Sequence, residues 1–458
     1  MILLSLLVSL PAWSPAAFPQ QEEAPPRGRA EAWRLDEVRT LDGETLEDVT
    51  ILVRDGVIER MGQAVVVPAG ARVHDLRGRD MVATPPLVLP HADFLVSDRR
   101  GRGNHSQYVA ADSVWLGEDW AEPLLEEGIL VVGVDPPGSG LPGRTSVLLV
   151  DPEQRRRPEP LVADLHLVVT VTTNAAAVKL VRQALEQGEK AIEKEEKARK
   201  EWEKARREWE EKQKAKEAEQ GSGKEGDGDQ GGEQGSGGAA AGGDGDGAAE
   251  EEAPPEEFEP PEIAPSLRAV VEWLRQERVA RVQIGSAADW LHWRDVLGER
   301  ALPYELVLRH PLGTNLVEVV DDLAAAAVRV DVPARISFLP YTRIRVNLPA
   351  ELAAAGVERL VLSPPSLDLR GVRDWRMAVA EVVAEGLDPE VALRAVTVEP
   401  AASLGQEELV APLAVGGPAT FTIWEGDPLD PLARARFVVH SGEVVYDRAA
   451  AEASETLR

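Results

Sequence analysis

The chain has 458 residues, more than one ordinary domain holds, and its apolar content of 43% is normal for a folded protein. The formal net charge of -29 argues against nucleic acid and anionic membrane surfaces as partners, because both would repel such a chain. No cysteine occurs, which excludes disulfides, thiolate metal sites and catalytic thiols.

The N-terminus has the order of a secretory signal. An apolar run from Ile2 to Leu10 is too short to span a bilayer, and prolines, small residues and a polar stretch follow it. The basic residues that usually open such a signal are missing, so a hydrophobic tail is the alternative. The pattern predicts a signal peptide at residues 1–24 and an exported protein, periplasmic or secreted. No later segment is apolar enough to cross a membrane.

Strand patterns occupy both ends of the chain. In VTILVRDGVIERMG two β-branched runs are joined through Asp55-Gly56, which predicts a hairpin, and a similar turn is expected at Ser441-Gly442. Neither end is large enough to form a stable sheet by itself. We therefore expect residues 31–83 and 411–449 to pack together as one small β-domain.

Between these ends, short apolar runs alternate with helical patterns. GILVVGV and YELVLRHP are typical of buried strands, and LRAVVEWLRQE is typical of an amphipathic helix. The alternation predicts a parallel sheet, either doubly wound or closed as a barrel, built from residues 84–177 and 263–410. In both architectures ligands bind at the carboxyl ends of the strands.

Residues 178–262 fit neither pattern and are interpreted as an insertion. A charged helix is expected from Val178 to about Ala218, because Glu and Lys or Arg recur four residues apart. A thin stripe of alanine and tryptophan predicts a face that rests on the protein's own fold, with a seam for a protein partner as the alternative. The acidic, Gly-rich stretch that follows predicts a disordered linker.

The segment GSGLPG, from Gly138 to Gly143, formally matches the dinucleotide-binding fingerprint. That fingerprint needs a helix to begin at the third glycine, so that its N-terminus holds the pyrophosphate. Here Pro142 interrupts the segment and the strand-like RTSVLLV follows it. A dinucleotide site is therefore not expected, and a flexible loop at the mouth of the sheet is.

Three polar residues are candidates for metal ligands. His91 and Asp93 alternate along the segment VATPPLVLPHADF, so both side chains could lie on one face of a strand. His310 stands just after the strand-like YELVLR. Lone histidines are ordinary polar residues more often than ligands, so the set gains weight only from its context.

Several segments together resemble the amidohydrolase superfamily, and within it the exported relatives of imidazolonepropionase. They are TLDGETLEDVTILVRDGVIERMGQAVVVPAGARVHDLRGRDMVATPPLV, LLEEGILVVGVDPPGSGLPGRTSVL, NLPAELAAAGV, GLDPEVALRAVTVEPAASLG and IWEGDPLDPLARARFVVHSGEVVYD. The resemblance implies a TIM-like (β/α) barrel with a small β-sandwich formed from both termini. It also implies a hydrolase that uses a divalent metal, with zinc as the expected ion.

The resemblance also shows where the family's ligands should be. A His-x-His pair is expected after Pro-Gly-Leu, and this chain has Pro85-Pro86-Leu87 followed by His91-Ala92-Asp93. One histidine is kept, and the aspartate can still bind zinc or a harder metal. His310 matches a later ligand. His91, Asp93 and His310 are thus the candidate ligands of one divalent metal that is weakly held or absent.

Two expected residues are missing. The middle-strand histidine has no counterpart around Gln283, and the position of the catalytic aspartate is occupied by Ser363-Pro364-Pro365. A proline neither binds metal nor moves a proton. Loss of the proton-transferring group typically costs about 10²- to 10⁴-fold in rate.

The leading hypothesis is an exported amidohydrolase-family protein with a degenerate metal site and little or no hydrolase activity. It would act in binding or assembly, with a small-molecule ligand at the barrel mouth. One alternative is an active metal-dependent hydrolase of non-peptide C–N bonds, acting on cyclic amides or peptide-like substrates. Another is an interaction scaffold whose protein partner binds the charged helix.

Overall fold

The computed structural model describes residues 30–97, 102–117, 119–171, 175–221, 256–309, 313–326 and 328–455. The expected signal peptide, most of the expected linker and the candidate ligand His310 lie outside these residues. Among the helices of the described chain, none is both long enough and apolar enough to cross a membrane.

Strands from both ends of the chain form one eight-stranded sheet. Its order is β21-β20-β19-β5-β1-β2-β3, and β4 pairs with β1. The strands are β1 (Glu31–Arg39), β2 (Thr45–Arg54), β3 (Val57–Gly62), β4 (Arg72–Asp75), β5 (Met81–Thr84), β19 (Phe421–Glu425), β20 (Arg434–His440) and β21 (Glu443–Asp447). Trp33 packs edge-on against Phe421, so the two ends share one apolar core. The packing of this sheet as a sandwich, and the domain boundaries, stay predictions.

Two hairpin turns link the ends further. Asp55 and Gly56 have φ angles of 51° and 77°, which suits the two-residue turn between β2 and β3. The turn between β20 and β21 is built alike, with Ser441 at 49°. The two turns touch, because a Cβ on Gly56 would lie 3.1 Å from the Ser441 carbonyl oxygen. Both predicted hairpins are confirmed.

The middle of the chain contains the expected parallel strands, but they form two hydrogen-bonded sheets. One has the order β11-β10-β8-β6 and the other β18-β15-β14-β13-β12-β9-β7. The strands are β6 (Leu87–Leu89), β7 (Gly103–Asn104), β8 (Ile129–Val134), β9 (Gly140–Arg144), β10 (Ser146–Leu149), β11 (Pro160–Val162), β12 (Leu167–Thr170), β13 (Ala280–Ile284), β14 (Tyr304–Leu308), β15 (Val330–Pro333) and β18 (Leu360–Ser363). Strands β12, β13, β14, β15 and β18 run parallel, as do β6 and β8. In the described residues the strands therefore do not close into one ring.

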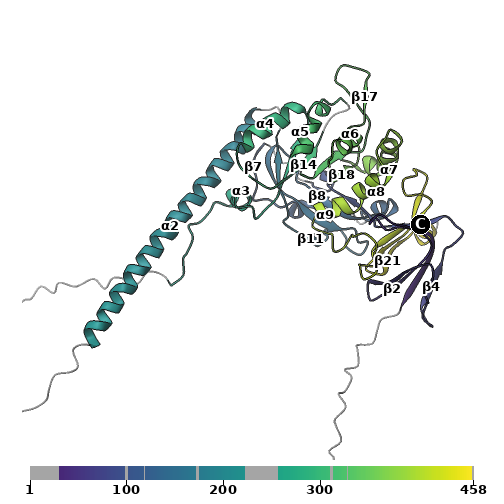
Figure 1. The fold of residues 1–458 in the computed structure, drawn as a ribbon, viewed down its shortest axis with the longest axis horizontal. Coiled ribbons are helices and arrows are strands. Elements are labelled where there is room, and N and C mark those ends of the chain that lie inside the picture. The colour runs from purple at the N-terminus through teal and green to yellow at the C-terminus, as the bar shows by residue number, and fades with distance from the viewer. Residues whose placement is uncertain are drawn as a thin grey trace, which may run out of the picture.

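Helices alternate with these strands and cover them (Figure 1). They are α1 (Glu122–Glu126), α3 (Pro265–Leu274), α4 (Ala287–Leu297), α5 (Val320–Ala325), α6 (Leu348–Ala354), α7 (Leu369–Ala384), α8 (Pro389–Val396) and α9 (Val398–Ser403), with α10 (Arg448–Glu455) after the last strand. Shorter elements are the 3₁₀ turns η1 (Asp93–Leu95), η2 (Ala110–Ser113) and η3 (Leu316–Val319) and the pair β16 (Ser337–Phe338) and β17 (Arg345–Val346). Polar side chains cap the start of several helices. At α4, for example, the Ser286 side chain accepts a hydrogen bond from the backbone amide of Asp289.

The charged helix α2 (Ala175–Gly221) begins three residues before the expected start and has 47 residues. Its first turns are buried through Val181 and Leu185, and it packs along α3. Further on, the Trp202 ring lies 5.9 Å from that of Phe258. The far end of the helix extends away from the rest of the molecule (Figure 1). Part of the apolar stripe thus rests on the protein's own chain.

The expectation of a flexible loop at GSGLPG is wrong. Gly140–Arg144 is strand β9, which pairs with β7 and β12 and is mostly buried. The glycines of this segment do not form a phosphate-binding loop. Gly143 instead allows the backbone of Tyr108 to lie close to β9, since a Cβ on Gly143 would lie 2.9 Å from the Tyr108 carbonyl oxygen. The pairing partners are distant in sequence, so the local pattern did not indicate a strand.

Gly133 on β8 offers a test of this packing. A Cβ at this position would lie 2.3 Å from the carbonyl oxygen of Pro90, so we expect Gly133→Ala to lower the free energy of unfolding by about 3 kcal/mol. Gly117→Ala is the matched control, because its Cβ would meet no atom within 4 Å, and we expect a change within about 0.5 kcal/mol. Urea unfolding measures both, and equal effects would contradict the close approach.

Candidate functional site

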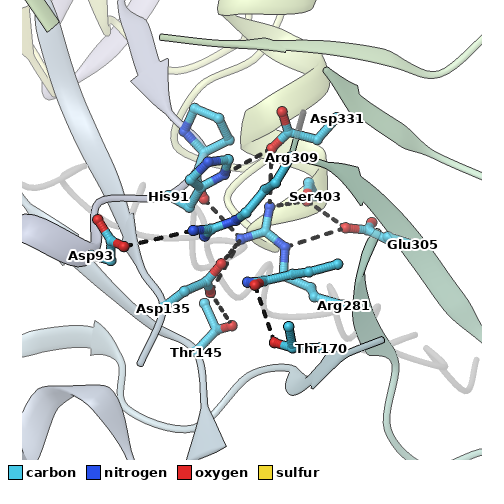
Figure 2. A network of polar contacts seen from close by, with 12 residues as sticks. His91, Asp93, Asp135, Thr145, Thr170, Arg281, Glu305, Arg309, Asp331 and Ser403 are labelled. Carbon is cyan, nitrogen blue, oxygen red and sulfur yellow. Dashed lines mark hydrogen bonds and ion pairs between the residues drawn. The ribbon is translucent and has the colours of Figure 1, made fainter. Parts of the chain in front are cut away.

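The two described candidate ligands lie near each other but engage different partners. His91 follows β6 and is 2% exposed, and its Nδ1 lies 3.0 Å from Oδ2 of Asp331 on β15. Asp93 begins η1, and its Oδ2 lies 3.6 Å from Nη1 of Arg309, just after β14. Figure 2 shows both pairs; His91 and Asp93 follow the carboxyl end of β6 and Arg309 that of β14, whereas Asp331 is the second residue of β15.

The guanidinium of Arg281 lies beside them, in the space between the two sheets (Figure 2). Arg281 is on β13 and has no exposed surface. Its Nη1 donates to the carbonyl oxygen of Pro90 at 2.9 Å and lies 3.3 Å from Oδ2 of Asp135. Because Pro90 and Asp135 follow β6 and β8, this one side chain joins the sheet that contains them to the sheet of β13.

Two further carboxylates approach the same guanidinium. Its Nε lies 3.9 Å from Oε2 of Glu305, and its Nη2 lies 3.8 Å from Oδ2 of Asp331. Burial by itself would lower the pKa of Arg281, but the charges of Asp135, Glu305 and Asp331 raise it above its usual value. Arg281 is therefore a permanent cation inside the protein.

Asp135 stays ionised for the complementary reason. Burial by itself would raise its pKa, but the charges of Arg281 and His91 lower it below its usual value. The hydroxyl of Thr145 also donates to its Oδ1 at 2.6 Å. We call the set of His91, Asp135, Arg281, Glu305 and Asp331 the interior network.

Strand register brings the network together. Side chains two apart on a strand share a face, so Arg281 and Gln283 lie on one face of β13 while Val282 lies on the other. Arg281 is opposite Glu305 on β14. The Gln283 side chain, in the region where a family histidine is expected, accepts a hydrogen bond from the Thr170 hydroxyl at 3.2 Å.

Sequence reasoning missed every charged member of the network except His91. A signal was present, because ARVQI, YELVL and VDVP each contain one charged residue in a strand that is otherwise almost apolar. Charged side chains are almost never fully buried unless they are paired. The pattern could have indicated buried ion pairs, although the sequence does not tell which residues pair.

The described residues do not fit a divalent metal. In the described ranges, no group of three or more histidine, aspartate and glutamate side chains could hold one. A metal beside His91 would also meet the guanidinium groups of Arg281 and Arg309, which repel a cation. Where the family's aspartate is expected, Ser363 is buried, and its hydroxyl has no hydrogen-bond partner within the described part of the chain.

Asp368, the nearest carboxylate in sequence to that position, has a structural task. It is the N-cap of α7 and accepts a hydrogen bond from the amide of Gly371 at 2.7 Å. This hydrogen bond and the one that the Ser366 hydroxyl donates lower the pKa of Asp368. An acid that stays ionised at a helix end is typical of a cap.

An apolar cavity adjoins this end of the strands. It has a volume of about 490 Å³ and is lined by Phe94, Trp115, Trp120 and Leu369, among others. Phe94 follows Asp93 directly, so the cavity begins next to the candidate ligands. Trp115 is 65% exposed, which leaves an aromatic face open to solvent.

Comparison of the chain with known proteins gives a fold. No family model matches the sequence, and no curated protein does. Among solved structures, an amidohydrolase from Thermotoga maritima matches 91% of this chain and 100% of its own, with 18% identity and a TM-score of 0.65.

More distant matches include a β-aspartyl dipeptidase from Fervidobacterium islandicum, in complex with β-Asp-Leu dipeptide, and an adenosine deaminase from Xanthomonas campestris with bound zinc. The first has 12% identity over 92% of this chain and 97% of its own, with a TM-score of 0.46. The second has 13% identity over 94% and 98%, with a TM-score of 0.45. On the strength of the Thermotoga structure, the chain has the fold of the amidohydrolase superfamily.

Proposed function

We propose that this protein is an exported amidohydrolase-fold protein in which internal ion pairs stand where metal-dependent hydrolysis would occur, and that it acts in binding or assembly. The observation that carries the proposal is the buried guanidinium of Arg281, which lies beside His91 and has three carboxylates around it. Export rests on the signal-like N-terminus alone. The likeness to exported relatives of imidazolonepropionase rests on the sequence segments alone.

The chemistry of the guanidinium supports this proposal. A metal-dependent hydrolase needs donor atoms with free lone pairs that converge on one point. Here Asp135 and Asp331 face a cation that is covalently part of the chain and cannot leave. The charges of both carboxylates are thus paired with Arg281, although Oδ1 of Asp331 accepts no hydrogen bond from the described residues.

The apolar cavity beside Phe94 supports a binding role. Ligand sites are commonly concave, largely apolar and about 300–1,000 Å³ in volume, and this one has about 490 Å³. It lies at the carboxyl ends of the strands, where ligands of α/β proteins bind. A small molecule held there would touch Trp115 and Trp120 without needing a metal.

The second candidate function, an interaction scaffold, is favoured by α2. Its far part extends away from the fold, and its exposed faces carry ion pairs such as Lys204 with Glu208, which contribute to the stability of the helix (Figure 1). The Trp209 ring there lies under the guanidinium of Arg206. A protein partner would bind this part of the molecule and not the strand ends.

Metal content tests the proposal first. Protein purified without chelator, incubated with zinc and dialysed is expected to carry far less than one metal ion per chain by elemental mass spectrometry. His91→Ala should leave that value unchanged, as should the control His292→Ala on the exposed face of α4. About one zinc, iron or manganese per chain, lost on His91→Ala alone, would instead favour the active hydrolase, with His91, Asp93 and His310 as ligands.

Removal of the central cation should destabilise the protein strongly. Arg281→Met takes the guanidinium away from the buried carboxylates of Asp135 and Asp331, and we expect a loss of about 3–5 kcal/mol in the free energy of unfolding. The control Arg182→Met breaks a solvent-exposed pair with Asp295 and should cost about 1 kcal/mol or less.

A double variant makes this test specific to charge. Arg281→Met with Asp135→Asn removes one cation and one anion, so it should recover part of the stability that Arg281→Met loses. Chemical unfolding followed by tryptophan fluorescence measures all four proteins. An Arg281→Met variant as stable as Arg182→Met would show that the network does not hold the sheets together.

A further inference from the structure

A second cavity, of about 470 Å³, opens at the opposite end of the parallel strands. Its lining includes His166, Arg329 and Arg359, which immediately precede β12, β15 and β18. His91 and Asp93, in contrast, follow the strand β6. The cavity is therefore separate from the candidate metal site and from the apolar cavity at Trp115.

His166 gives this cavity a buried polar group without a partner. The side chain is 4% exposed, and no hydrogen bond of the described residues reaches its Nδ1. Burial lowers its pKa to about 4, so the ring is neutral near pH 7 and offers one N–H donor and one acceptor. Buried polar atoms are normally satisfied, and one that is orphaned at a cavity can be satisfied by a ligand.

The other acidic and basic groups at the inner wall neutralise each other. Glu305 accepts a hydrogen bond from Nη1 of Arg329 at 2.9 Å and one from the Ser403 hydroxyl at 2.6 Å. Arg329 also lies 3.8 Å from a carboxylate oxygen of Glu399. Neither Glu305 nor Arg329 is thus a free charge for a ligand.

Arg359 is the exception. It is exposed, lines the cavity, and forms no ion pair with any residue that the structure describes. A guanidinium binds carboxylates through two parallel hydrogen bonds, which makes it a suitable anchor for one. The uncommitted charge of the cavity is therefore positive. Its remaining wall is largely apolar, with Leu302 and Val328 among the lining residues.

We propose that this cavity binds a small monocarboxylate with an apolar chain. The carboxylate pairs with Arg359 at the rim, and the chain lies against Leu302 and Val328 beside the buried His166 ring. The volume is in the range of small-molecule sites. This assignment stands whether or not the site at His91 binds metal, because neither His91 nor Asp93 lines this cavity.

The probe for this proposal is hexanoate, titrated into the full chain by isothermal titration calorimetry. Hexylammonium, which has a similar chain and the opposite charge, should not bind. Arg359→Gln should weaken hexanoate binding at least tenfold, whereas Arg343→Gln, at an exposed arginine away from the cavity, should leave it unchanged. Ala402→Phe, which places a ring in the cavity, should abolish binding.

Each other outcome overturns the proposal. No heat with hexanoate up to its solubility limit, or equal binding of hexylammonium, excludes an anion site. Binding that survives Arg359→Gln and Ala402→Phe but is lost in Trp115→Ala belongs to the other cavity. Circular dichroism melts check that the variants fold, and Arg359→Gln keeps the test decisive if Ala402→Phe does not, because Arg359 is exposed.

Discussion

The cost of burying a charge governs the interior of this protein. Arg281 has no contact with solvent, and an isolated guanidinium in such a place would be strongly unfavourable. It is tolerated because Asp135, Glu305 and Asp331 come from separate strands and surround it. The position of each strand end is therefore linked to the others through one side chain. A buried ion pair of this kind adds little net stability, but breaking it is costly.

This constraint reaches both ends of the strands. At the carboxyl ends, Asp331 also holds His91, while Asp93 engages Arg309. At the amino ends, Glu305 also holds Arg329. The carboxylates at one end are thus paired with arginines of the protein. At the other end, Glu305 and Arg329 of the inner wall are paired with each other. The chain shares the fold of an amidohydrolase, but a shared fold does not by itself carry the chemistry, so fold and chemistry are separate inferences.

The binding roles proposed for the two ends of the strands depend on the side chains that do not take part in these ion pairs. Beside Phe94 the wall is largely apolar, with Asp119 as its charged residue, and no member of the network is in the cavity lining. Beside His166 the internal charges cancel, and the exposed Arg359 has no counter-charge among the residues that the structure describes. The two cavities should therefore differ in the ligands they accept, one by apolar contact and the other by charge as well.

The sequence by itself determined those features whose physics is local. Three such features depend on neighbouring residues: the hairpin at Asp55-Gly56, the two ends of α2, and the alternation of apolar strands with helices. The ends of α2 were predicted to within about three residues. The resemblance to amidohydrolases likewise predicted the fold. Only the tertiary structure decided that Gly140–Arg144 is a strand, because its partners are far away in the chain. Arg281 and Asp135 are 146 residues apart, so no local pattern could pair them. That pairing places a fixed positive charge beside His91.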